Sequence, residues 1–525
     1  MNKLVILSAI LALTLSLSAK EAPTPGFNNK IPDAIMTPDK VQTSIGDLNF
    51  VDGRPTDETV KKVYDNLDTM RGVDVFLNFI PAGSVEAMRV GMASIGADTS
   101  NKVMIVDTLL DSDPIFLTGN TDTVYASAVL DLEKDGPTVV EIPAGAGPGT
   151  VNDAFFRFVV DMGAPGPDRK KGGTYIILPP KYKGELKPTP NTFSDNSSTK
   201  AMIGGEERDV WIVQSRSYNN WLILRGFLVD GKPDAAVKMW KEGLKIYPLS
   251  KAKNPPKMEH INFSKKAFNT IHANNFEFYK EIDHVIQKEP ISFIDPELRG
   301  QAAAIGIVKG KKFNPDARMK KILINAMAIA NATARTISFA PRDKSAKFFE
   351  DRQWLNGFIG NDHEWLNGDG LSGRNLDART LFFYLATVNT PAMVLQVPGI
   401  GSNYALCVKD AKGNYLDGAK NYKINIPANV PAKDFWSIVA YDPQTRSELQ
   451  TDNRYPSINS KIAKLDYNKD GSVDLYFGPT PPKGKEENWI QTEASKGWFT
   501  LFRFYGPLQP WFDKTWKMGD FELIK

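Results

Sequence analysis

The sequence predicts an α+β fold in which two β-sandwich or jelly-roll-like domains are joined by a helical segment. Short apolar runs alternate with Gly, Pro, Asp and Asn over residues 103–218, and this pattern returns over 379–505. Residues 232–345 between them have the apolar spacing of helices. A length of 525 residues allows two to four domains. The predicted parts are a signal peptide (1–19), an extended lead-in (20–55), an N-terminal β-rich domain (56–231), a helical segment with a connection (232–375) and a C-terminal β-rich domain (376–525).

The N-terminus has the layout of a secretory signal peptide. Lys3 supplies a positive charge, residues 4–17 are apolar, and Ser18 and Ala19 are small residues suited to cleavage. We therefore expect a mature protein that starts near Ala19, is exported to the periplasm or secreted, and has no stable membrane insertion. An uncleaved N-terminal membrane anchor is the alternative.

Helices are predicted at three places. Residues 57–79 carry an amphipathic spacing with acidic residues at the start, and residues 84–96 suggest a second short helix. Residues 316–338 carry an apolar stripe, which a helix facing a core explains without any cofactor.

A weak internal repeat links the two β-rich regions. Phe155 and Phe156 precede an apolar run that ends in an aspartate, and Phe435 and Trp436 do the same about 280 residues later. Two domains with related strand topology would give this pattern, and so would a chance match between strand sequences.

Composition excludes some partners and leaves others open. The charge is only +3, with 64 Lys and Arg against 61 Asp and Glu, so neither nucleic acid nor an acidic surface is indicated. Cys407 is the single cysteine, so no intramolecular disulfide can form, and its apolar neighbours predict a buried thiol. The 29 Phe and 10 Trp residues either fill the cores or line an apolar ligand pocket. Composition does not decide whether the protein forms a homo-oligomer.

Familiar catalytic and metal-binding motifs are missing. There is no P-loop, no Gly-x-Ser-x-Gly elbow and no Cys-x-x-Cys, and His363-Glu364 lacks the second histidine of a zincin helix. Residues 466–474 have oxygen side chains at calcium-loop spacing, but Phe477 stands where the bidentate acid belongs. We therefore predict a hairpin turn at Asp470-Gly471 that needs no metal. The cofactor stays unknown, with a divalent metal as the alternative.

Five polar motifs occur in a fixed order beside predicted strands. They are Asn-Thr-Asp-Thr-x-Tyr (120–125), Leu-Asp-Gly-Ala (416–419), Phe-Trp-Ser (435–437), Asn-Arg-Tyr (453–455) and Arg-x-Tyr-Gly-Pro (503–507). In this order they resemble the bacterial family that pairs two domains of unknown function, DUF1254 and DUF1214. The resemblance covers roughly residues 60–520. It implies an exported two-domain protein, while the biochemical role of the family is largely unsettled.

Candidate site residues come from these motifs and their neighbours. The candidates for catalysis are Asp122, Tyr125 and His363, and those for substrate binding are Asn120, Arg379, Tyr404, Arg454, Arg503 and Tyr505. A carboxylate can act as a base or metal ligand, and guanidinium groups bind anions bidentately. The structural alternatives are Asx turns at Asn120 and Asp122, internal ion pairs for the arginines, wall positions for the tyrosines and an exposed loop at His363.

Two functions remain open at this stage. One is hydrolysis of a small amphiphilic ester by carboxylate- or metal-activated water, with arginines binding an anionic group. The other is non-catalytic binding of an amphiphilic ligand or a partner. In both cases we expect the site between the two β-rich domains, with Asp122 and Tyr125 facing C-terminal arginines, because ligand sites favour domain interfaces.

Overall fold

The computed structural model describes residues 31–192, 195–368 and 373–524. It confirms a mixed α+β fold, with 26% helix and 28% strand arranged in several open sheets. Among the described residues no closed barrel or jelly roll is seen. The predicted signal peptide lies outside the described residues. The chain divides into two compact units, Met1–Arg71 and Gly72–Lys525.

The first unit holds a small antiparallel sheet. Its strands are β1 (Lys40–Thr43), β2 (Gly46–Val51) and β3 (Arg54–Pro55), paired in that order. Gly46 supplies the positive φ of the β1–β2 turn, at 99°, where the Thr43 hydroxyl donates to the Gly46 carbonyl.

One long helix replaces the two short helices that the sequence predicts near the N-terminus. Helix α1 (Asp57–Ser94) continues through Pro81, although proline removes a helical hydrogen bond. Phe79, Ile80 and Ala82 around it are fully buried, so packing outweighs the local cost.

Two open sheets make the N-terminal β-rich domain, and the order of their strands follows. One sheet runs β14 (Glu259–Asn262), β4 (Lys102–Ile105), β5 (Val124–Asp131), β12 (Asn219–Gly226), β7 (Pro148–Asp153) and β8 (Phe158–Gly163). The other runs β10 (Thr199–Ile203), β11 (Glu206–Gln214), β9 (Gly173–Leu178), β6 (Thr138–Ile142) and β13 (Lys245–Pro248). Strands β13 and β14 come after residue 231, so the domain draws strands from the region predicted as helical.

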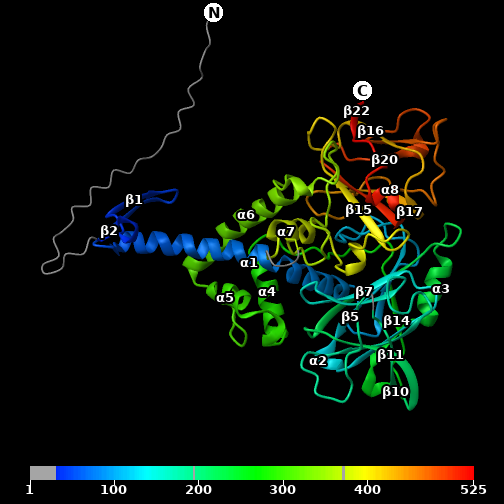
Figure 1. Cartoon of the computed structure of the whole chain (residues 1–525), viewed down its shortest axis with the longest axis horizontal. Coiled ribbons are helices and arrows are strands. Elements are labelled where there is room, and N and C mark those ends of the chain that lie inside the picture. Colours follow the sequence, from blue (N-terminus) through cyan, green and yellow to red (C-terminus); the bar gives the residue numbers. More distant parts are fainter. Residues whose placement is uncertain (1–30, 193–194, 369–372, 525) are drawn as a thin grey trace, which may run out of the picture. The chain divides into compact units, whose positions relative to one another are not determined.

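The C-terminal β-rich domain has two four-stranded sheets around one core. They run β15 (Ser402–Cys407), β21 (Phe499–Pro507), β17 (Ala432–Tyr441), β18 (Ser457–Asn459), and β20 (Trp489–Gln491), β19 (Val473–Gly478), β16 (Asn421–Ile426), β22 (Glu522–Ile524). Ile438 and Phe502 of the first sheet and Ile424 and Leu475 of the second belong to the same buried cluster. Figure 1 follows the chain from the cyan and green N-terminal strands to the yellow and red C-terminal strands.

Helices fill the sequence between the two β-rich domains. They are α3 (Asp234–Gly243), α4 (Glu277–Lys288), α5 (Pro296–Ala304), α6 (Ala317–Phe339) and α7 (Leu376–Leu385), while α2 (Leu132–Asp135) and α8 (Gln509–Phe512) are single turns within the β domains. Short 3₁₀ helices occur at Asp33–Ile35, Leu249–Lys251, Ile291–Phe293, Lys344–Ala346, Pro391–Met393 and Glu486–Asn488. Helix α6 agrees closely with its predicted range. Its length and composition would also suit a membrane span, with 33% of its most apolar window buried in the protein.

Helix α7 corrects the prediction that the β pattern resumes at Arg379. Asn375 caps this helix, because its side chain accepts from the backbone N–H of Ala378 at 2.9 Å. Every residue from Ala378 to Leu385 is buried, so the helix is apolar all round and carries no amphipathic signal.

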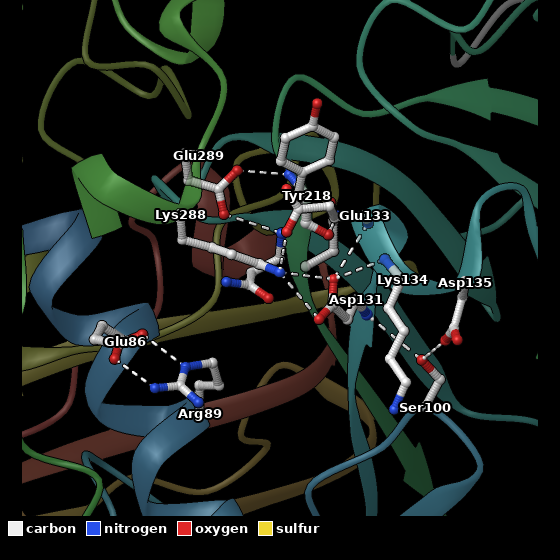
Figure 2. A network of polar contacts seen from close by, with 12 residues as sticks. Glu86, Arg89, Ser100, Asp131, Glu133, Lys134, Asp135, Tyr218, Lys288 and Glu289 are labelled. Carbon is white, nitrogen blue, oxygen red and sulfur yellow. Dashed lines mark hydrogen bonds and ion pairs between the residues drawn. The ribbon is translucent and has the colours of Figure 1, made fainter. Parts of the chain in front are cut away.

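A network of paired charges fixes helix α4 to the N-terminal domain (Figure 2). Lys288 donates to both oxygens of Asp131 at 3.1 Å and to Glu133 at 2.5 Å. The next residue, Glu289, accepts from the backbone N–H groups of Tyr218 and Asn219. We call these three ion-pairing residues, Lys288, Asp131 and Glu133, the Lys288 network.

The predicted internal repeat is wrong. Phe155 and Phe156 lie in the turn between β7 and β8, where Phe156 has a φ of 54°. Phe435 and Trp436 lie inside strand β17 instead. The two pairs share sequence pattern and burial but occupy non-equivalent places.

Two local predictions are confirmed. Residues 466–474 form a tight hairpin, in which Gly471 has a φ of 81° and Asp470 accepts from the N–H and hydroxyl of Ser472. Cys407 is fully buried in the C-terminal core, where burial raises the pKa of its thiol.

Candidate functional site

The segment before strand β5, residues 117–123, runs against the C-terminal sheet. The Thr118 N–H donates to the Arg446 carbonyl at 2.8 Å, and the Tyr441 hydroxyl donates to the Gly119 carbonyl at 2.5 Å. Leu110 leaves no room for a side chain at Gly119, since a Cβ atom there would lie 2.1 Å from Leu110 Cδ2. This segment therefore carries the first polar motif into the interface between the two β-rich domains.

Asp122 is held by three side chains of the C-terminal domain. Its Oδ2 accepts from Ser437 Oγ at 2.5 Å and from the Tyr505 hydroxyl at 3.1 Å, and its Oδ1 accepts from Asn459 Nδ2 at 3.0 Å. Asp122 is 1% exposed. Burial raises the pKa of its carboxyl, against the opposing charge of Arg503 and these three hydrogen bonds. Asp122 thus joins the domains rather than forming an Asx turn.

Asn120 forms the Asx turn and also orients a tyrosine. Its Oδ1 accepts from the backbone N–H of Asp122 at 2.9 Å, and its Nδ2 donates to the Tyr125 hydroxyl. Tyr125 lies opposite Arg225 in the antiparallel β5–β12 pair, with the guanidinium 5.7 Å from the ring centroid. The β register therefore brings an arginine that sequence reasoning missed next to the first motif.

Arg503 on strand β21 is buried beside Asp122 but is not fully bonded. Its Nη2 donates to the Tyr441 hydroxyl at 2.6 Å and makes long contacts of 3.4 Å to the carbonyls of Thr118 and Gly119. Its Nη1 is buried without a hydrogen-bond partner. Arg157, Arg379 and Arg446 also keep a buried guanidinium nitrogen without a hydrogen-bond partner, but of these arginines Arg503 is the one that lines the cavity described below.

Glu448 is a second buried acid in this region. It lies across a β-bridge from Tyr441, is 2% exposed, and neither of its carboxyl oxygens has a hydrogen-bond partner. Burial raises its pKa well above the usual value, and the charge of Arg503 opposes this rise. We call Asp122, Glu448 and Arg503 with the donors to Asp122 the Asp122 cluster.

A cavity of about 80 Å³ adjoins this cluster, and we call it the inner cavity. Its polar lining comes from Asn120, Tyr125, Arg225, Tyr404 and Arg503. Its apolar lining comes from Phe116, Ile223, Phe358, Leu381, Phe382, Leu385, Met393, Leu406, Phe499 and Leu501, with Thr118, Gly357, Ala386 and Thr387 completing it. Strands of the N-terminal sheets, strands of the C-terminal sheets and helix α7 all contribute side chains to this lining.

Comparison with known families agrees with this arrangement. A family model described as a protein of unknown function, DUF1254, matches residues 100–248, and a second one, DUF1214, matches residues 401–509. The chain pairs a DUF1254 domain with a DUF1214 domain. The lining of the inner cavity includes Tyr125 and Arg225 from the DUF1254 region and Tyr404 and Arg503 from the DUF1214 region.

The comparisons with solved structures and with curated proteins assign no function to this chain. The VPA0106 protein of Vibrio parahaemolyticus is 18% identical, with 86% of this chain and 100% of that chain covered and a TM-score of 0.48. A putative uncharacterized protein of Burkholderia cenocepacia is 13% identical, with 88% and 96% covered and a TM-score of 0.37. No curated protein matches.

Five predicted site residues do not line the inner cavity, namely Asp122 and Tyr505, which bond to each other, and Arg379, Arg454 and His363. Arg379 on helix α7 donates to Asn78 at 2.6 Å, and burial lowers its pKa to about 10. Arg454 pairs with Asp111 and Asp113 on the N-terminal side of the interface. His363 is half-buried against the edge of the Phe158 ring, and burial lowers its pKa.

The side chain of Tyr505, predicted for substrate binding, does not line the inner cavity. It stacks on Phe435 with ring centroids 4.1 Å apart and directs its hydroxyl to Asp122 instead of into the cavity. Among the described residues no three His, Cys, Asp or Glu side chains converge as metal ligands would. The arginines and tyrosines of the inner cavity are groups that can recognise an anion, and they lie beside an apolar wall.

Two residues of this region, Arg225 and Glu448, belong to none of the sequence motifs. Arg225 does leave a signal, because it is the one charged residue in the apolar run Trp221-Leu222-Ile223-Leu224 and its continuation. Glu448 leaves none, since it follows Thr445-Arg446-Ser447 in a segment that reads as a polar turn.

Proposed function

We propose that this protein binds a small amphiphilic anion in the inner cavity between its DUF1254 and DUF1214 domains. The observation that carries the proposal is the pair of arginines, Arg225 and Arg503, at the polar part of a cavity whose other walls are mostly apolar. Guanidinium groups bind carboxylate, sulfonate or sulfate bidentately, and an apolar wall favours an alkyl or aryl group.

The charges around the cavity support an anionic ligand. Arg503 faces two buried acids, Asp122 and Glu448, but burial raises the pKa of Glu448 well above its usual value and so favours its neutral form. When Glu448 is protonated, the two guanidinium groups that line the cavity exceed the single carboxylate of Asp122 in charge. Uncompensated buried charge is costly, and an anion would remove that cost.

The cavity volume limits the part of the ligand that it can hold. The cavity measures about 80 Å³. An engineered cavity of about 150 Å³ in another protein holds benzene. A carboxylate with a short alkyl group is therefore a suitable test ligand.

Hydrolysis is the second candidate, and the raised pKa values of Asp122 and Glu448 are the observation that favours it. Carboxyls with raised pKa values serve as general acids in many enzymes. A general acid or base must reach the substrate, however, and Asp122 already accepts three hydrogen bonds without lining the cavity. Binding without turnover is therefore the better-supported function.

The proposal includes export and a sandwich architecture. The apolar segment at residues 4–17 motivates a periplasmic or secreted location, which cell fractionation and N-terminal sequencing would test. The shared core of the two C-terminal sheets supports a β-sandwich there, with the paired N-terminal sheets as its counterpart.

A titration with simple ligands tests the proposed binding. Butyrate, butylammonium and butanol would be titrated calorimetrically into the mature protein, and we expect binding of butyrate alone. Arg225→Met should weaken butyrate binding about tenfold or more, because a hydrogen bond to a charged group is lost. Arg216→Met is the matched control, since Arg216 is exposed and lies just before strand β12.

The outcomes separate the two functions. Binding of butylammonium or butanol in preference to butyrate would contradict the anion site, and so would unchanged butyrate binding by folded Arg225→Met protein. Release of product from butyrate esters, lost in Glu448→Gln or Asp122→Asn protein that retains its fold, would establish the hydrolase instead.

A further inference from the structure

A second hollow, which we call the outer chamber, lies directly beside the inner cavity. The outer chamber measures about 260 Å³. Phe358, Met393 and Tyr404 line both spaces, so these three side chains separate them. Of the three, Met393 is half-exposed and has three rotatable bonds, so this part of the partition can move without any change in the backbone.

The outer chamber differs chemically from the inner cavity. Four side-chain amides line it, from Asn356, Asn361, Gln396 and Asn403, together with the stacked rings of Phe348 and Trp511. Its charged residues are Lys347 and Lys514. No Asp or Glu belongs to this lining, so the lysines face the chamber without a carboxylate among its walls.

The lysines are placed to meet a charged group from solvent. Both are exposed, and the Lys514 ammonium lies 5.4 Å from the centroid of the Phe348 ring. Among the described residues neither lysine forms an ion pair within 4.0 Å, and the charge of Lys347 acts on the half-buried Asp520 carboxyl, where it opposes the rise in pKa that burial causes. An anion at this position would gain two favourable charges and the amide groups of Asn361 and Gln396, since the amides of Asn356 and Asn403 already donate to backbone carbonyls.

We propose that the outer chamber is a second subsite for the same ligand, which would be an elongated molecule with an anionic group at each end. One end pairs with Arg225 and Arg503, an apolar middle passes Phe358 and Met393, and the other end reaches Lys347 and Lys514. An α,ω-dicarboxylate has this chemistry. The inference rests on the proposed function and narrows its ligand class.

The test compares monocarboxylates with dicarboxylates of the same carbon number, from four to ten carbons, by titration calorimetry on the mature protein. Above a threshold length the diacid should bind about threefold to tenfold more tightly than the monoacid, since each exposed charge pair contributes modestly. The Lys347→Gln/Lys514→Gln double variant should lose this gain and keep the affinity for butyrate. Lys344→Gln/Lys483→Gln, which removes two exposed lysines outside both spaces, is the control.

The titrations distinguish failure of the second subsite from failure of the proposed function. The second subsite is overturned if diacids never exceed monoacids at any length, or if the double variant weakens butyrate as much as it weakens diacids. Failure of the proposed function has a different signature, namely no butyrate binding or no effect of Arg225→Met, whatever the lysine variants do.

Discussion

The Lys288 network and the Asp122 cluster both join separate parts of the chain through charges, but they do so in opposite ways. In the Lys288 network each charge has an opposite partner, and the side chains of Lys288, Asp131 and Glu133 remain 23%, 32% and 52% exposed. In the Asp122 cluster the groups are buried, and Arg503 Nη1 and both oxygens of Glu448 lack partners.

This difference separates a structural contact from a candidate binding site. Paired, partly hydrated charges stabilise an interface modestly and need no ligand (Figure 2). Unpaired charges in an interior cost free energy. An unpaired charged group that lies beside a cavity can form a hydrogen bond or an ion pair with a bound molecule. The incomplete bonding of Arg503 points to a ligand because Arg503 also lines the inner cavity, which Arg157, Arg379 and Arg446 do not.

The largest effect is expected from Asp122→Asn. The amide keeps the size of the carboxylate but places an NH₂ group among three donors and removes the charge that faces Arg503. We expect the free energy of unfolding to fall by about 3 kcal/mol, as when one partner of a buried pair is removed. Urea unfolding checks this, and a loss below that of Lys288→Met would contradict the comparison.

Glu448→Gln should act in the opposite direction. A carboxyl whose folded pKa lies above its unfolded value binds more protons in the folded state, so it destabilises the fold as pH rises above about 4.5 towards the folded pKa. Glutamine cannot ionise, so the variant should be more stable than the parent at pH 8 and should lose that advantage below pH 4.5, where the parent carboxyl is protonated in both states. It should also show a flatter dependence of melting temperature on pH between 5 and 8. Equal pH profiles for variant and parent would show that Glu448 ionises freely.

Lys288→Met should have a small effect that salt removes. Its ion pairs are partly exposed, so we expect a loss of about 0.5–1 kcal/mol in the free energy of unfolding at low salt. At 1 M NaCl the difference should shrink, because screening acts over a few ångströms. A loss of several kcal/mol that persists in high salt would make this network as critical as the Asp122 cluster.

No measurable effect is expected from calcium at the 466–474 hairpin. The Asp470 carboxylate accepts two hydrogen bonds from Ser472 within the turn, and hydrogen bonding lowers its pKa. Melting curves with and without millimolar calcium should coincide. A calcium-dependent rise in melting temperature that Asp470→Ala abolishes would reveal a metal site.

The sequence revealed the parts of this molecule that depend on local pattern. Helix α6 follows its apolar stripe, and the hairpin at Gly471 follows its turn residues. Helix α7 was missed because burial on all sides leaves no amphipathic period. Helix α1 was predicted as two helices, 57–79 and 84–96, but it runs through Pro81 because local propensity yields to packing.

The candidate site was also predicted only in part from the sequence. Motif order identified Asn120, Asp122 and Arg503, which the structure brings together across more than 380 residues of chain. Arg225 joins them only through the β5–β12 register, and Glu448 only through the bridge to Tyr441. Such partners are set by tertiary contacts, which a single sequence does not display.

The most direct test of the central claim is titration of butyrate into the mature protein and into its Arg225→Met and Arg216→Met variants at pH 7. The account predicts binding by the parent and by Arg216→Met, and about tenfold or greater weakening by Arg225→Met at unchanged melting temperature. Equal butyrate binding by all three folded proteins would contradict an anion site at Arg225.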